Sequence, residues 1–316
     1  KDTDERYAMK AKDDKVFVLP ADLARTLLAR PLAFADRNLT TFTRADQAIQ
    51  ETGKRRAVFT KAGSDWKMTS PVEAKAEDAE LESFVKDLTR FRAGELVDAK
   101  PADLKKYGLE KPETVWTFRL GDKQVMKLLV GAVESAKDKE PRRYAKIDGN
   151  DTVFLLAPRT TQQALAEYRD RKVLEGFDAV KAEQIIFKSP AGTYKLRKSD
   201  TTWTLLEEPD KKVNAKVVTE TLDALAGLKA AHYLTDTADA EQEVLTGLQK
   251  AEWTIELRSE KETFVLSVGR QVAGGKDRYA KTASGPALFI LREADLEKIL
   301  RPSTAFVAAG KSEEKK

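Results

Sequence analysis

The chain offers few side chains that could carry out catalysis. It contains one histidine, His232, and no cysteine among its 316 residues. The absence of cysteine excludes thiol catalysis, disulfides and thiolate metal sites, and a histidine-based triad would have to use His232. In the internal alignment described below, His232 is matched by Glu95. A position that accepts glutamate indicates a solvated side chain rather than a catalytic imidazole.

Two groups of carboxylates could also do chemistry. Glu207, Glu208 and Asp210 follow a tryptophan closely, and paired carboxylates can hydrolyse glycosidic bonds. The matching segment 67–71 after Trp66 has no acidic residue. The carboxylate group is therefore specific to one unit, and it is either functional or without a role. The second group, DGND at 148–151, suggests a calcium loop but lacks its ligand spacing and closing glutamate. An Asp-Gly pair between two expected strands predicts a hairpin turn instead.

Phosphate contacts are the third possibility. Gly269 and residues 274–275 surround Arg270, and bare amides with a guanidinium suit an anion. This segment lies between two expected strands and does not open a helix, so we interpret it as a loop. The basic clusters 54–56 and 142–143 could touch phosphate or anionic lipid, but their acidic neighbours favour solvated strand faces. We therefore predict no catalytic, metal-binding or cofactor-binding residue and no cofactor.

The composition favours a folded, soluble chain. Hydrophobic residues make up 41% of it, and 56 basic against 52 acidic side chains leave a formal charge of +4. Because the opposite charges nearly cancel, the chain does not need a polyanionic partner, and we expect no nucleic-acid partner. No segment approaches the roughly 18–20 uninterrupted apolar residues that a membrane helix needs. A small, charged C-terminal tail at 308–316 is expected to be disordered.

The sequence contains an internal repeat, which indicates where the helices and strands lie. Trp66 and Trp203 are 137 residues apart, and the same offset pairs Trp116 with Trp253. It also pairs the apolar positions of a predicted helix, namely Leu81 with Val218, Val85 with Leu222, Leu88 with Leu225 and Phe91 with Leu228. Self-similarity over such a period is typical of repeat architectures. We expect the four tryptophans to pack in the cores or on the sheets.

A partial third copy stands at the front of the chain. Residues 6–8 and 16–20 match residues 143–145 and 153–158, including the RYA motif and a following apolar strand. We therefore expect the chain to begin inside a unit, with more of the pattern upstream. A strand hairpin without the rest of its unit is a candidate for pairing in trans. Residues 1–45 are thus a possible surface for self-association.

Periodicity gives the plan of one unit. Residues 184–205 contain three short alternating runs separated by turn residues, which predicts antiparallel strands. A helix with one apolar face follows, with Asn214 as its N-cap. A second helix, PADLKKYGL, is expected to end at Gly108, because glycine adopts the left-handed conformation without steric cost. Four further strands complete the unit, so sheet and helix alternate in an α+β plan.

The sequence therefore predicts an α+β fold. It would be a tandem repeat of antiparallel-sheet units, each with two to three helices. We expect about two full units plus a leading partial unit. The predicted boundaries are 1–45 for the C-terminal part of an incomplete upstream unit, 46–178 for the first full unit, 179–307 for the second and 308–316 for the tail.

The order of several motifs resembles a known family. These motifs are the tryptophan strands WKMTSP and WTLLEEP, then YGLEKP, the glycine-ended strands LLVG and LSVG, RYAK and the closing DRKVLEGF. Together they resemble the bacterial domain-of-unknown-function family 4340, which is often encoded beside auxiliary subunits of gliding-motility-type ABC transporters. The resemblance runs from about Ile49 to Phe306 plus the leading fragment. It departs at Thr246, where the first unit has Tyr107.

The resemblance implies an extracytoplasmic, periplasmic protein, membrane-anchored through a segment absent from this chain. It supplies no catalytic residue. We therefore favour a non-enzymatic binding or scaffold module with protein partners, plausibly an accessory component of an envelope ABC transporter or gliding-type system. The alternative is a carboxylate-dependent hydrolase or carbohydrate-binding protein that uses a cleft between units.

Overall fold

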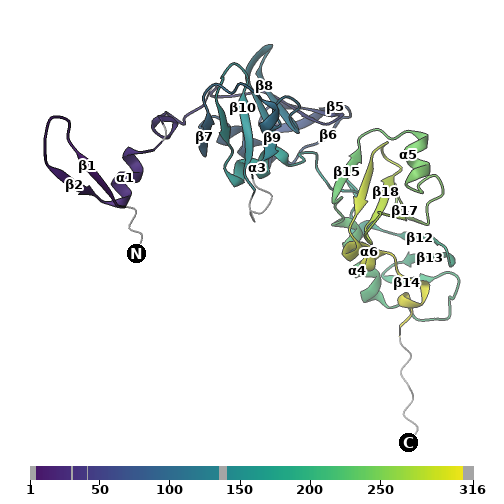
Figure 1. The fold of residues 1–316 in the computed structure, drawn as a ribbon. Helices are drawn as coiled ribbons and strands as arrows, with labels where there is room; N and C mark the ends of the chain where they lie inside the picture. The colour runs from purple at the N-terminus through teal and green to yellow at the C-terminus, as the bar shows by residue number, and fades with distance from the viewer. Residues whose placement is uncertain (1–4, 30, 41, 135–140, 309–316) are drawn as a thin grey trace, which may run out of the picture. The chain divides into compact units, whose positions relative to one another are not determined.

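The structure, a computed structural model, describes residues 5–29, 31–40, 42–134 and 141–308 (Figure 1). The chain divides into two compact units. Unit 1 comprises residues 1–67 and 78–168, and unit 2 comprises residues 68–77 and 169–316. Apart from residue 308, the tail predicted to be disordered lies outside the described residues.

A nine-stranded sheet has the order β6-β5-β4-β3-β8-β9-β10-β11-β7. Its strands are β3 (Gln47–Thr52), β4 (Arg55–Ala62), β5 (Asp65–Ser70), β6 (Ala74–Lys75), β7 (Glu95–Asp98), β8 (Thr114–Leu120), β9 (Lys123–Val133), β10 (Arg143–Ile147) and β11 (Val153–Leu155). Along β8 every second side chain is buried, including Trp116 and Phe118. This period of two places one face of the strand on the core.

An eight-stranded sheet has the order β14-β13-β12-β16-β17-β18-β19-β15. Its strands are β12 (Gln184–Ser189), β13 (Gly192–Ser199), β14 (Thr202–Leu205), β15 (His232–Thr235), β16 (Trp253–Arg258), β17 (Thr263–Gln271), β18 (Arg278–Thr282) and β19 (Leu288–Leu291). Strand β12 lies between β13 and β16, as β3 lies between β4 and β8. The two sheets therefore share one connectivity, and β6 is the additional edge strand of the larger one.

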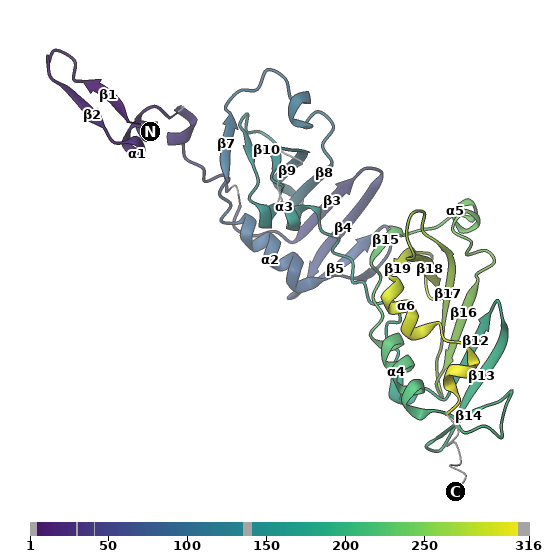
Figure 2. The same cartoon turned by 60° about the horizontal axis from the view of Figure 1, so that its bottom comes forward.

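Two helices are long enough to cover a sheet face. Helix α2 (Asp78–Leu88) buries Leu81, Phe84, Val85 and Leu88, and α4 (Ala215–Ala226) buries Val218, Thr221, Leu222 and Leu225. These positions are three and four residues apart, so each helix has one apolar face. Figure 2 shows each helix lying along the sheet of its own unit. The predicted N-cap is confirmed, since the Asn214 side chain accepts a hydrogen bond from the Val217 amide at 3.4 Å.

The other helical segments are short. They are α1 (Ala21–Leu27), α3 (Pro158–Leu165), α5 (Ala240–Leu245), α6 (Glu293–Ile299) and the 3₁₀ turns η1 (Pro31–Phe34), η2 (Lys105–Tyr107), η3 (Ala179–Lys181) and η4 (Ser303–Phe306). None of the helices in the described part of the chain combines the length and apolar character needed to cross a membrane.

The predicted α+β fold class is wrong. Strand accounts for 39% of the structure and helix for 21%, so the protein is mostly β. The error has a local cause. The second helix predicted at PADLKKYGL is only the 3₁₀ turn η2, although it does end at Gly108 in the left-handed conformation. Its counterpart α5 has six residues. Such short segments cap the sheets and do not form a helical layer.

Glycine is required at one position in β9 and at one position in β17, where a turn lies against the strand backbone. A Cβ on Gly131 in β9 would collide with the Tyr107 carbonyl oxygen, and one on Gly269 in β17 would collide with the Thr246 carbonyl oxygen. The Arg270 amide donates to that same Thr246 oxygen at 2.9 Å. The turn therefore contacts the strand backbone directly, which explains the glycine-ended strands of both units.

We predict that Gly269→Ala lowers the free energy of unfolding by about 1–3 kcal/mol, because the atom in the way belongs to the backbone and cannot rotate aside. Gly275→Ala is the matched control. No heavy atom lies within 4 Å of a Cβ built there, so its effect should stay within about 0.5 kcal/mol. Urea-induced unfolding measures both. Equal stability of the two variants would contradict the close approach.

Candidate functional site

The first candidate site is the N-terminal hairpin. Strands β1 (Arg6–Met9) and β2 (Val16–Leu19) pair antiparallel, with Arg6 opposite Leu19 and Met9 opposite Val16. Together they form a separate two-stranded sheet. Among the described residues, neither strand pairs with a third one. Both outer edges of the hairpin thus present backbone groups that another strand could pair with.

Its side chains are unusually exposed for a sheet. Val16, Phe17 and Val18 have exposed fractions of 62%, 47% and 51%. The matching residues Val153–Leu155 are 0–1% exposed. Scattered exposed apolar residues are ordinary, but three consecutive ones on a paired strand leave apolar side chains exposed on both of its faces.

The difference lies in what covers the strand. Strand β11 has a neighbour on each side, β10 and β7. Its Phe154 packs against Phe91, which follows α2, with ring centroids 5.5 Å apart. The described residues give β2 only one neighbouring strand. The hairpin therefore has the apolar side chains of a core strand without the strand and aromatic ring that bury them in unit 1.

Helix α1 continues this exposed apolar character. Its Leu23 and Leu27, with the following Leu28, are exposed, whereas Ala24 is buried. We call Tyr7, Val16–Val18, Leu23, Leu27 and Leu28 the leading surface. It combines free strand edges with branched and aromatic side chains, which is the chemistry that recognises an extended segment of another protein.

The predicted carboxylate group lies on the loop after β14. A Glu207 oxygen accepts a hydrogen bond from the Lys195 backbone amide at 2.8 Å, and Glu208 forms an ion pair with Lys211. Both contacts fix the loop. Across the described ranges, no three His, Cys, Asp or Glu side chains are grouped so that they could hold a metal ion.

The other sequence candidates lie at structural positions. His232 is an exposed residue at the start of β15, opposite Ile290. Residues 148–151 connect β10 to β11, with Gly149 at a φ of 79° and the Asn150 side chain accepting from the Thr152 amide at 2.9 Å. This is the geometry of a hairpin turn. Gly269 belongs to strand β17 rather than to an anion-binding loop.

The basic clusters are paired with acids. Arg55 forms an ion pair with Glu167. Arg142 contacts Glu134 at 2.8 Å and Glu95 at 3.2 Å. Arg143 also pairs with a carboxylate, that of Glu113. Each guanidinium is largely neutralised where it lies, so neither cluster forms a continuous positive surface for a polyanion.

The ion pair between Arg169 and Asp236 was not predicted from the sequence. Arg169 donates to Asp236 at 2.7 Å, both side chains are largely buried, and the guanidinium lies 3.8 Å from the centre of the Tyr233 ring. The partners are 67 residues apart in sequence. No local pattern could have joined them. The contact fixes the segment that enters unit 2 against the strand β15.

We expect Asp236→Ala to lower the free energy of unfolding by about 3–5 kcal/mol, because it leaves the Arg169 charge buried without its carboxylate. The control is Lys216→Gln, which removes an exposed pair with Glu220 that spans 3.9 Å. An exposed pair of this kind contributes about 0–1 kcal/mol. Denaturant titration of both variants is the measurement. A loss from Asp236→Ala no larger than that of the control would refute the buried-pair interpretation.

The fold is that of a mostly β protein with two large antiparallel sheets of the same connectivity. A family model described as a domain of unknown function, DUF4340, matches residues 66–251, which is more than half of the chain. The chain belongs to this family. No curated protein and no solved structure matches it.

Proposed function

We propose that this protein is a non-enzymatic binding module that recognises protein partners through the leading surface. The observation that carries the proposal is the exposure of Val16–Val18 on a strand whose counterpart in unit 1 is fully buried. Burying these side chains against a partner would remove apolar area from water and so favour association.

The mode of binding follows from the free edges. An added strand would satisfy the unpaired backbone groups of β1 or β2, and its alternate side chains would meet the apolar ones of the hairpin. Main-chain hydrogen bonds would supply affinity, while the positions of Phe17 and Tyr7 would supply specificity. The leucines of α1 would enlarge the contact.

The wider setting is also part of the proposal. The shared connectivity of the two sheets supports treating the units as copies of one repeat, and repeats offer extended surfaces for partners. The family resemblance supports a place in the envelope, outside the cytoplasm, with a membrane anchor in the full-length protein. An accessory role for an ABC transporter or gliding-type system fits such a module. The absence of cysteine is compatible with this location.

The hydrolase alternative has less support. Glu207 and Glu208, its best candidates, are engaged with the Lys195 amide and with Lys211. A glycosidase needs one carboxyl group held protonated as the acid and a second placed across the scissile bond. The two contacts instead hold both side chains on the loop.

The direct test compares Phe17→Asp with Val180→Asp, because Val180 is also exposed and apolar but lies in unit 2. Each variant is expressed in the native envelope, crosslinked and purified, and the recovered proteins are quantified by mass spectrometry. We expect Phe17→Asp to reduce the recovery of transporter subunits about tenfold, equivalent to about 1.4 kcal/mol. Val180→Asp should leave it unchanged. Equal recovery with both variants, or recovery of glycan alone, would contradict the proposal.

Self-association through residues 1–45 is the other form that this binding can take. The mass of the purified chain by light scattering distinguishes it from binding to a different protein. A dimer that Phe17→Asp converts to a monomer identifies a second copy as the partner. A monomeric mass for the unaltered chain, with the amides of β2 protected from hydrogen exchange, would rule self-association out.

A further inference from the structure

Unit 2 contains a pocket that is lined in part by aromatic side chains. It has a volume of about 250 Å³ and lies beside the β12–β13 turn, the end of β14 and the segment after α6. Its walls include Tyr194, Leu205, Trp253 and Pro302, and its rim carries Glu207 and Glu208. A concave site with aromatic walls and few polar groups is typical of ligand binding.

Trp253, which lines this pocket, is less covered than its counterpart in unit 1. In unit 1 the matching Trp116 is fully buried. Its ring lies 5.2 Å from Phe84, 5.7 Å from Phe118 and 5.6 Å from Tyr168. Its indole nitrogen donates to the Ala164 carbonyl oxygen at 2.8 Å. Every side of that ring therefore has a partner.

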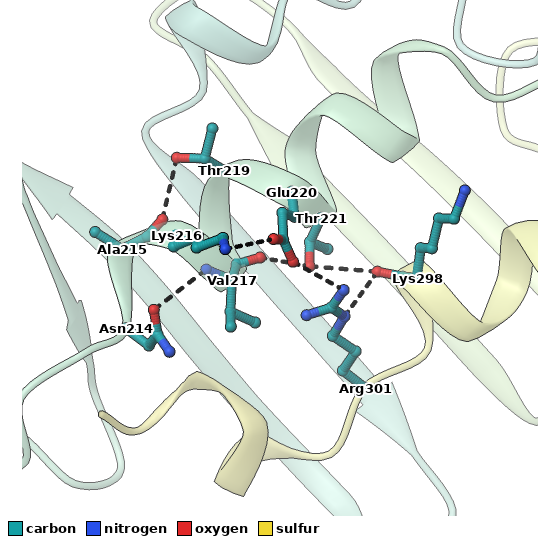
Figure 3. Close-up of polar contacts among 9 residues, drawn as sticks. All are labelled: Asn214, Ala215, Lys216, Val217, Thr219, Glu220, Thr221, Lys298 and Arg301. Atoms are coloured by element: carbon teal, nitrogen blue, oxygen red, sulfur yellow. Dashed lines mark hydrogen bonds and ion pairs between the residues drawn. The ribbon is translucent and has the colours of Figure 1, made fainter. Parts of the chain in front are cut away.

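The same offset of 137 residues replaces those aromatic neighbours in unit 2. Thr221 stands in place of Phe84, and Ile255 in place of Phe118. The Thr221 hydroxyl is occupied, because it contacts the Val217 and Lys298 carbonyl oxygens at 2.9 and 3.4 Å (Figure 3). Trp253 is only partly buried against the core of unit 2, and among the described residues it forms neither a ring pair of the kind that surrounds Trp116 nor a hydrogen bond from its indole nitrogen.

The walls around Trp253 are held in place. The Tyr194 hydroxyl donates to the Arg301 carbonyl oxygen. The Arg301 side chain in turn donates to the Lys298 carbonyl oxygen at 3.0 Å and contacts Glu220 at 3.3 Å, which ties the segment after α6 to helix α4 (Figure 3). A pocket fixed in this way loses little conformational freedom when it binds a ligand.

The charges at the rim select the ligand. Glu207 accepts from a backbone amide, and no basic side chain among the described residues forms an ion pair with it. Glu208 is neutralised by Lys211, and none of the lining residues is basic. The pocket is therefore negative overall and should exclude anions. A tryptophan face next to an uncompensated carboxylate attracts organic cations, because the ring quadrupole and the charge act in the same direction.

We propose that the Trp253 pocket of unit 2 binds an organic cation, such as an alkylammonium group, against the indole ring with Glu207 as its counter-ion. The proposal does not depend on the leading surface. The two sites lie in different units of the chain, and either could fail without the other.

Choline is the probe, and 3,3-dimethylbutan-1-ol, its neutral analogue of the same shape, is the ligand control. Both are titrated into the full chain labelled with nitrogen-15 at the tryptophan indoles. We expect choline to shift the Trp253 resonance saturably and to leave that of the buried Trp116 unchanged. The neutral analogue should bind at least about fivefold more weakly, because it lacks the charge.

Two variants locate the site. Glu207→Gln keeps the shape of the loop and should weaken choline about fivefold, while Trp253→Leu should abolish its binding. Glu260→Gln is the matched control, since it removes an exposed carboxylate of unit 2 that does not line the pocket, and it should leave choline binding intact. Equal binding of choline and its neutral analogue would overturn the proposal. A lack of any saturable shift at millimolar choline would overturn it too, as would binding of N-acetylglucosamine in preference to choline.

Discussion

The structure depends on one constraint: the apolar face of each large sheet must be covered by other side chains. Each large sheet carries a row of bulky side chains that must be removed from water. In unit 1, α2 supplies that cover. Its Phe84 lies 5.2 Å from Trp116 and 5.9 Å from Phe118, and Tyr168 stacks on Phe84 at 6.0 Å. Four interlocking rings fill the layer between this helix and the sheet.

Both proposed binding surfaces lie where this cover is thinner. In unit 2 the helix position of Phe84 is taken by Thr221, whose hydroxyl bonds to backbone carbonyls, and Trp253 becomes the wall of a pocket. At the N-terminus, β1 and β2 have the apolar pattern of a core hairpin without its neighbouring strands. The same sequence motif thus serves as core in one place and as surface in another, according to its neighbours.

This dependence on neighbours explains what the sequence could and could not predict. The hairpins, the Asn214 cap and the left-handed Gly108 follow from local rules and are confirmed. The fold class was wrong, because a helix-like sequence pattern as short as PADLKKYGL cannot reveal that it closes as a single 3₁₀ turn. The four tryptophans do pack in the cores or on the sheets as expected: Trp66 and Trp116 are buried, and Trp203 and Trp253 are partly buried against the core of unit 2.

The site was harder to predict than the elements. Glu207 and Glu208 were recognisable as acids specific to one unit. They form part of a pocket only together with Trp253, which lies on the distant strand β16. The Arg169–Asp236 pair joins residues 67 positions apart and left no periodic trace. In both cases the decisive partner is distant in sequence, and local patterns carry no information about it.

Covalent footprinting with hydroxyl radicals, read residue by residue by mass spectrometry, tests the central claim most directly. The claim is that matched residues differ in exposure because their cover differs. The account predicts that Phe17 and Trp253 react much faster than their matched partners Phe154 and Trp116 in the folded chain, and that unfolding removes the difference. Equal reactivity within each matched pair in the folded chain would contradict it.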